Sequence, residues 1–296
     1  MQEMLLKNGN MSVLATAFAM SFLVWPTPGH SGQITAESNA RDRMNLAGRE
    51  RMLTQQLTRN ACFVMAGVAP DRFAQRTQEN VEDFNRVLVG LRDGDAELGL
   101  LPETDPGVLA ALDDIEALWE QFRPAAQQIS AGDFHTIPME QLVSLNMATL
   151  KQMHETVMAM ADIYTNDNMS PDLLKTVAVA GRQRMLSQKV SKEVCFKIIG
   201  LDGLGASDLV EATIQDFDDA MARLMTGSEA DGILPPPNEA TLAQLQVTNA
   251  TWQEFKQLVA DIQGEAEVPA ETKIRLSNLS DQVLKEMNAA VQLYVQ

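Results

Sequence analysis

The chain has 296 residues, a formal net charge of −17 and 5% aromatic residues. This length predicts about two domains, and the strong negative charge argues against nucleic acid as the main partner. Because aromatic residues are scarce and no run shows strict apolar alternation bounded by turn residues, we expect an all-α fold.

The first residues are typical of an exported protein. An apolar run from Met11 to Val24 follows a single basic residue, Lys7, and precedes small residues up to Ser31. The run is short for a membrane span, so we predict a signal peptide over residues 1–31 and a periplasmic, soluble mature chain; an uncleaved membrane anchor is the alternative. No later apolar stretch is long enough to predict a transmembrane helix.

A segment that follows occurs twice. Residues 45–63 (NLAGRERMLTQQLTRNACF) and 179–196 (VAGRQRMLSQKVSKEVCF) match without a gap at an offset of 133 residues, and we call them the first and second box. The same offset pairs Phe84 with Phe217, Gly94 with Gly227, Pro102 with Pro235 and Trp119 with Trp252. After a slip of one residue, 150–153 matches 284–287. The chain is therefore a duplicated unit, and we expect the two copies over residues 32–166 and 171–296.

Apolar residues at helical spacing predict four helices in each unit. The expected ranges are 38–67, 71–93, 108–130 and 139–166 in the first unit and 172–199, 206–225, 240–264 and 270–294 in the second. Short connections favour an up-down-up-down bundle, in which an even number of helices returns the chain to the pole where it began.

The connection between the units determines how they are arranged. The connector 165–171 is too short to run along a bundle about 40 Å tall. We therefore expect two tandem four-helix bundles side by side, as an intramolecular pseudo-dimer with level, parallel boxes. An end-to-end rod with a continuous helix through 160–175 is the alternative, and Pro171 argues against it.

The box helices have an unusual second face. At about 100° per residue, one face is an ordinary apolar stripe, and the opposite face carries small and polar residues. These residues are Gly48, Arg51, Gln55, Thr58 and Cys62 in the first box and Gly181, Arg184, Gln188, Ser191 and Cys195 in the second. A glycine inside a helix costs roughly 1 kcal/mol relative to alanine. Such a face favours close contact with another helix, and the other box is the expected partner.

Cys62 and Cys195, the two cysteines of the chain, are at equivalent positions on this face. Two thiols in an exported protein tend to form a disulfide, so we predict a bridge between them. Two buried free thiols are the alternative, because a bridge needs Cα atoms within about 7 Å of each other.

Motifs for catalysis and for cofactors are absent from the sequence. The histidines His30, His135 and His154 match no metal spacing, and there is no phosphate-binding loop, dinucleotide fingerprint or nucleophile elbow. We therefore expect neither an enzyme nor a metal or cofactor site.

Facing boxes would instead create a site for a small anion. Arg51 and Arg184 would approach one point, where two buried guanidiniums without a counter-charge are unfavourable. A small oxyanion between them would remove that penalty through paired N–H donors. The glycines would let the backbones approach, and the glutamines would add amide donors. The expected ligand-binding residues are Arg51, Arg184, Gly48, Gly181, Gln55 and Gln188.

An alternative explanation for these arginines needs no ligand. Each would pair with a carboxylate, such as Glu50 or Glu193. The helical wheel also separates the neighbouring arginines: Arg49 and Arg182 lie well away from the second face and are expected to contact helices of their own bundle.

The two boxes, and the Leu-Lys-x-Met ends of the fourth helices, resemble the periplasmic sensor domain of type IV pilus methyl-accepting chemotaxis transducers, the PilJ-type domain. That domain is similar to the sensor domain of the nitrate/nitrite sensor kinases, in which a homodimer of four-helix bundles holds one anion between two box arginines. The resemblance implies this role for Arg51 and Arg184. The chain differs from the nitrate sensors in Arg49 and Arg182, which follow the glycine directly as in pilus-type boxes.

These observations predict an exported sensor protein whose two units bind a small ligand between the boxes, such as nitrate or nitrite. A membrane chemoreceptor or a sensor kinase is the expected partner, because the sequence shows no kinase or methyl-accepting module. The alternative is a ligand-free periplasmic interaction or structural protein that docks on a pilus, receptor or envelope partner.

Overall fold

A computed structural model describes residues 34–132, 136–164, 171–201 and 206–294, so the predicted signal peptide lies outside the described residues. Within these ranges the chain is all-α, as predicted. The first unit contains α1 (Ala36–Met65), α2 (Pro70–Asp93), the short 3-10 helix η1 (Ala96–Leu98), α3 (Pro106–Ser130) and α4 (Thr136–Tyr164). The second unit contains α5 (Pro171–Ile198), α6 (Ala206–Thr226), α7 (Glu239–Gly264) and α8 (Ala270–Tyr294).

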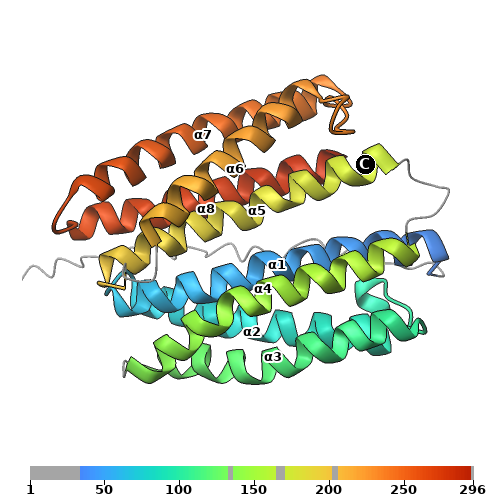
Figure 1. Cartoon of the computed structure of the whole chain (residues 1–296), viewed down its shortest axis with the longest axis horizontal. Helices are drawn as coiled ribbons and strands as arrows, with labels where there is room; N and C mark the ends of the chain where they lie inside the picture. Colours follow the sequence, from blue (N-terminus) through green and yellow to red (C-terminus); the bar gives the residue numbers. More distant parts are fainter. Residues whose placement is uncertain (1–33, 133–135, 165–170, 202–205, 295–296) are drawn as a thin grey trace, which may run out of the picture.

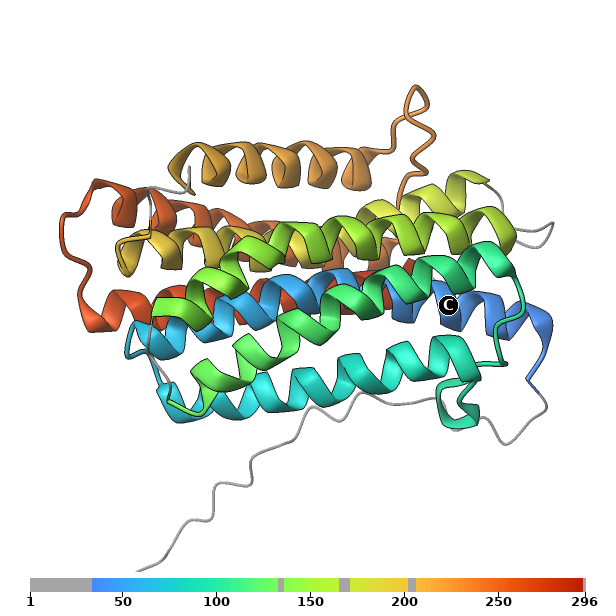
Figure 2. The ribbon, with the colours of Figure 1, turned by 60° about the horizontal axis from the view of Figure 1, so that its bottom comes forward.

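The two units are four-helix bundles that lie side by side (Figure 1). The box helices α1 and α5 are in contact and run in the same direction, while α2 and α6 lie on opposite sides of this pair in both views (Figures 1 and 2). The chain is therefore an intramolecular pseudo-dimer, and the end-to-end rod is wrong. None of the helices in the described part of the chain is long and apolar enough to span a bilayer.

Local signals in the sequence set the helix ends. Thr35 and Ser38 form a capping box at the start of α1, and Asp105 caps α3 through the backbone N–H groups of Gly107 and Val108. Side-chain caps of this kind satisfy backbone donors that have no partner inside the helix. The starts of α1 and α3 are therefore encoded locally. The predicted ranges agree with the structure to within three residues.

The turn after the second helix of each unit explains one repeated glycine. Gly94 and Gly227 have φ of 84° and 78°, and an added Cβ would lie 2.8 Å and 3.0 Å from the backbone nitrogen of Pro102 and Pro235. Only glycine combines this backbone conformation with so close an approach. The repeated Gly and Pro are therefore a matched pair that closes the same turn in both units.

Each bundle has an aromatic centre that the duplication preserves. Trp119 stacks on Phe84 with ring centroids 4.0 Å apart, and Trp252 stacks on Phe217 at 3.8 Å. All four rings are buried. Such stacking contributes about 0.5–1.5 kcal/mol beyond the burial of area.

The box helices are buried on every side at their centre. Every residue from Met52 to Val64 in α1 is buried, and α5 is buried from Gln183 to Phe196 apart from Lys189, which is partly exposed. One face packs in its own bundle and the opposite face packs against the other unit. The polar second face of each box is therefore an interior surface.

Candidate functional site between the box helices

The C-terminal halves of the boxes are joined covalently. Cys62 and Cys195 form a disulfide in the structure, with Cα atoms 6.1 Å apart and both side chains fully buried. The bridge lies across the contact between α1 and α5. It therefore links the two units covalently near the C-terminal ends of the box helices.

One helical turn after the glutamine of each box, a basic side chain reaches across to the other unit. Lys192 Nζ donates to Gln55 Oε1 at 2.8 Å, and Arg59 donates to Gln188 Oε1 in the equivalent contact. Lys192 occupies the position of Arg59, and Gln188 occupies that of Gln55, so the exchange follows the pseudo-twofold axis. Both glutamine oxygens thus hold the units together. The predicted role of the glutamine side-chain NH2 groups as donors to a ligand is not needed to explain the burial of these residues.

Both cations also reach the fourth helix of the opposite unit. Lys192 donates to Asn146 Oδ1 at 2.7 Å, and Arg59 donates to Ser280 Oγ at 3.1 Å, at equivalent positions on α4 and α8. The symmetry ends at the next residue. Asp281 accepts from Arg59 at 2.9 Å, whereas its counterpart Met147 is 49% exposed and offers no charge.

Asp281 is shared by three arginines. Besides Arg59, it accepts from Arg72 at 2.9 Å and from Arg76 at 2.5 Å, both on α2. Lys192 has no ion pair among the described residues, and burial lowers its pKa to about 8. The same position in the duplicated box is therefore neutralised in one unit and not in the other.

Arg51 and Arg184 lie nearer the start of the boxes, and neither joins an ion pair among the described residues. Arg51 is half-buried, and its Nη1 is 3.2 Å from His154 Nδ1. Arg184 is 4% exposed; its Nε donates to Gly181 O at 3.3 Å and its Nη1 contacts Asn288 Oδ1 at 3.5 Å. These partners are uncharged carbonyl, amide and imidazole groups. In the described part of the chain, no carboxylate forms an ion pair with either guanidinium.

The charge of Arg51 acts on Arg184. Burial, followed by the charges of Arg51 and Arg49, lowers the pKa of Arg184 to about 10. Burial and the charge of Arg182 lower the pKa of Arg51 to about 10. The centre of the pseudo-dimer at this level is therefore a desolvated region with an excess of positive charge.

The carboxyl groups named as alternative partners lie beside other basic residues. Glu50 Oε1 is 3.9 Å from Arg49 Nε, and Glu193 Oε1 is 2.6 Å from Lys189 Nζ. Glu50 is fully buried, and desolvation raises its pKa to about 8. A carboxyl group that is largely protonated near neutral pH cannot neutralise a nearby arginine. The ligand-free explanation based on these two residues is thus not what the structure shows.

Arg49 and Arg182 behave as predicted. Arg49 pairs with Asp83 at 3.3 Å and Arg182 pairs with Asp216 at 2.6 Å, and in each case the aspartate lies on the second helix of the same bundle. These arginines hold each box in its own unit. Their charges still reach the other box, where those of Arg49 and Arg182 add to burial in lowering the pKa of Arg184 and Arg51 respectively.

The space beside each box glycine is not filled by the backbone of the other box, as expected, but by a side chain. A Cβ at Gly48 would lie 3.6 Å from Arg51 Nη2, and one at Gly181 would lie 3.3 Å from Arg184 Nη2. In each box the nearest group is thus the guanidinium three residues later in the same helix. The glycines let these side chains lie along their own helix, rather than serving mainly to bring the two backbones together.

His154 is the site residue that the sequence analysis missed. It lies on α4 beside Arg51, and the one-residue slip that aligns the fourth helices pairs it with Asn288, which lies beside Arg184. That alignment was the signal that could have identified it. Histidine spacing alone gives no sign of it, because no second histidine is involved.

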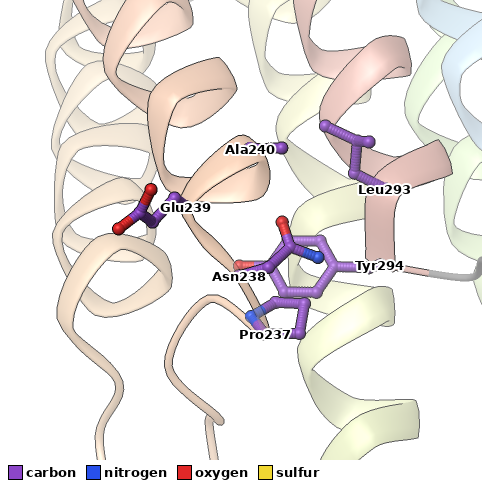
Figure 3. Close-up of a pocket in the computed structure, with 6 residues that line it drawn as sticks. All are labelled: Pro237, Asn238, Glu239, Ala240, Leu293 and Tyr294. Atoms are coloured by element: carbon purple, nitrogen blue, oxygen red, sulfur yellow. The ribbon is translucent and has the colours of Figure 1, made fainter.

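A cavity lies elsewhere in the described part of the chain. It has a volume of about 720 Å³ and lies between the start of α7 and the end of α8, lined by Pro237, Asn238, Glu239, Ala240, Leu293 and Tyr294 (Figure 3). None of the box residues contributes to it. Its wall has one carboxylate and no cation, so it does not suit an anion.

A comparison with protein families identifies the family of both units. The family described as type IV pili methyl-accepting chemotaxis transducer N-term, PilJ, matches residues 35–145 and again residues 169–278. The chain belongs to the PilJ family. The family comprises sensory domains of chemoreceptors, and this chain carries two of them in tandem. A comparison with curated proteins gives no significant match.

Both matched regions of the PilJ family contain a box, so Arg51 and Arg184 fall within them. The matches end at residues 145 and 278, before the fourth-helix residues that contact the two arginines. His154 and Asn288 therefore lie outside the matched regions.

Proposed function

We propose that this tandem PilJ protein is an exported sensor that binds one small oxyanion between α1 and α5, with Arg51 and Arg184 as the principal binding residues. The observation that carries the proposal is the pair of desolvated guanidiniums without an ion pair among the described residues. A buried charge that lacks a counter-charge is strongly unfavourable, and natural proteins retain one where it has a use.

The contacts of the two arginines suit an exchangeable ligand. Arg184 bonds a backbone carbonyl and an amide at 3.3 Å and 3.5 Å, which are long for charged donors. A hydrogen bond between a guanidinium and an oxyanion is shorter and about twice as strong as a neutral one. A planar or tetrahedral oxyanion can therefore displace these partners. Nitrate, nitrite, sulfate and phosphate all meet this requirement.

The disulfide favours a movement of one end only. Arg51 precedes Cys62 by 11 residues, about 16 Å along the helix. An anion at Arg51 and Arg184 would draw the N-terminal halves of α1 and α5 together while the bridge holds their C-terminal halves. A membrane chemoreceptor or sensor kinase that contacts this pole would read the change.

Calorimetric titration of the protein with each of the four anions tests the proposal. We expect one site per chain for at least one anion, and its loss in Arg51→Gln and in Arg184→Gln. Arg123→Gln is the control, because Arg123 is an arginine on the outer helix α3 whose ion-pair partner is Glu120. Binding that survives both box substitutions would reject the site.

The second candidate is a ligand-free interaction protein. It is favoured by the box glutamines, whose oxygens are already bonded to Lys192 and Arg59 across the units. In that case none of the four anions would bind, and substitution of Arg51 would affect only docking of a pilus, receptor or envelope partner. The titration thus separates the two functions.

A further inference from the structure

His154 is placed to respond to the charge of the proposed site. Its ring is exposed on α4, and its Nδ1 lies 3.2 Å from Arg51 Nη1. A guanidinium can only donate hydrogen bonds, so Nδ1 must accept. The ring is therefore neutral in this contact, with its proton on Nε2.

The charged groups around His154 come from three helices. Arg51 on α1 and Arg182 on α5 both disfavour the imidazolium, and Glu155, the next residue on α4, favours it. Glu155 is itself 3.5 Å from Lys151 Nζ. The ring is covered on the side that faces these groups, and this partial burial, followed by the charges of the two arginines, lowers the pKa of His154.

An anion at Arg51 would reverse this balance. The guanidinium would turn its N–H donors to the anion, so Nδ1 would lose the donor that it now accepts from. The anion would also offset the positive charge that disfavours the imidazolium. Both changes favour a ring that carries two N–H donors and a positive charge.

We propose that His154 is a third binding residue of the anion site, and that the protein takes up a proton on His154 when a permanently ionised oxyanion binds. This inference rests on the proposed function and adds the regulation of that site. The direction of the effect follows from linkage. Because the pKa of His154 is higher in the complex than in the free protein, affinity is greatest below the free-state pKa and declines as pH rises through the pKa of the complex.

The chain supplies its own control. Asn288 occupies the position of His154 beside Arg184, and it cannot titrate. His154→Asn therefore makes the two halves of the site alike without introducing a residue that the fold has not already accommodated there. It retains an oxygen that can accept from Arg51.

The test is calorimetry of the full mature chain with potassium nitrate and with sodium sulfate at pH 5.5, 6.5 and 8, in buffers with different ionisation enthalpies. These salts do not titrate in this range, so a proton taken up on binding comes from the buffer to the protein. The wild type should bind about threefold or more tightly at pH 5.5 than at pH 8, with a rise of at most about tenfold per pH unit. His154→Asn should show neither proton uptake nor this rise.

A second readout follows the ring itself. In histidine-labelled protein, the NMR signal that is absent from His154→Asn should titrate at a higher pH when nitrate or sulfate is present. Anion binding that depends on Arg51 but takes up no proton, or a His154 signal that does not move, would overturn the inference and leave the proposed function intact. Absence of binding of both salts at all three pH values would overturn the inference, and absence of binding of nitrite and phosphate as well would overturn the proposed function.

Discussion

Lys192 on α5 donates a 2.8 Å hydrogen bond to the side-chain oxygen of Gln55 on α1. The equivalent contact, from Arg59 to Gln188, runs in the opposite direction between the units. The two contacts are made by residues of a duplicated segment and are related by the pseudo-twofold axis. Where the two halves of the chain carry different residues at equivalent positions, each half indicates a substitution for the other.

The first such difference concerns Asp281 and Met147. Asp281→Met gives the second unit the residue that the first unit has at this position, and it leaves the buried Arg59 without its carboxylate. We therefore expect a loss of about 3–5 kcal/mol in the free energy of unfolding. Urea denaturation monitored by circular dichroism measures it. A loss below about 1 kcal/mol would mean that Asp281 is only a solvated surface charge.

The reciprocal substitution should have the opposite sign. Met147→Asp places a carboxylate where Lys192 lacks one, and Met147 is 49% exposed, so the new charge remains hydrated. We expect a gain of about 1 kcal/mol in the free energy of unfolding at pH 7. Ser144→Asp, on the same helix, is the control for a mere increase in negative charge, and an equal gain there would contradict the pairing.

Glu50 gives a prediction for pH. Burial raises the pKa of Glu50 to about 8, well above the value of about 4.3 in an unfolded chain. The folded protein therefore holds this proton more tightly, and the resulting stability is complete below about pH 4.3 and is lost as pH rises towards 8. The second unit has Gln183 at the equivalent position, donating to Phe217 O at 2.8 Å.

Glu50→Gln should therefore remove this pH dependence. We expect the variant to be about as stable as the wild type at pH 5 and more stable by a few kcal/mol at pH 8. Urea denaturation of both proteins at pH 5, 6.5 and 8 gives the difference, in which the other ionisable groups cancel. Parallel pH curves for the two proteins would show that Glu50 is ionised in the folded state.

The helices and their pairing could be predicted from the sequence, whereas the contacts across the seam could not. Periodicity and caps locate a helix because they are local, and the offset of the boxes together with the short connector at Pro171 requires the units to lie side by side. A helical wheel gives the direction of Arg59 but not the helix that it meets. It could not show that Arg59 is neutralised by α8, or that His154 on α4 reaches Arg51.

The role of the box glycines can be tested by adding a methyl group. A Cβ at Gly48 would lie 3.6 Å from Arg51 Nη2, which is ordinary contact, and helix propensity favours alanine by roughly 1 kcal/mol. We expect Gly48→Ala to leave the free energy of unfolding unchanged or to raise it by up to about 1 kcal/mol. A loss of several kcal/mol would show that α5 packs directly on this glycine.

Gly181→Ala is the more restrictive case. Its Cβ would lie 3.3 Å from Arg184 Nη2, so the guanidinium must move away from the helix. We expect the variant to fold and to bind the anion at least about threefold more weakly than Gly48→Ala does, because Arg184 loses its present position. Equal affinities in the two variants, measured by the same titration, would contradict this role.

The disulfide closes a loop of 133 residues. Replacing both cysteines by serine should lower the free energy of unfolding by about 2–4 kcal/mol, because the bridge restricts the unfolded chain. The units should nevertheless stay paired, since the hydrogen bonds of Lys192 and Arg59 still connect them without the bridge. Small-angle X-ray scattering of the variant checks the pairing, and an increase in the radius of gyration to that of two separate bundles would show that the bridge alone holds the units together.

Arg184 and Arg59 are both buried box arginines, and they should respond in opposite ways to the same substitution. Arg59 is neutralised by Asp281, whereas Arg184 has no ion pair among the described residues and burial lowers its pKa to about 10. Removing an unneutralised buried charge relieves its desolvation penalty, so Arg184→Gln should raise the Tm of the anion-free protein by about 2 °C or more while it abolishes anion binding. Arg59→Gln should lower the Tm by several degrees, because it breaks a paired network. Differential scanning calorimetry in an anion-free buffer gives both values. A fall in Tm for Arg184→Gln as large as that for Arg59→Gln would mean that Arg184 is retained for stability, and the proposed site would lose its physical basis.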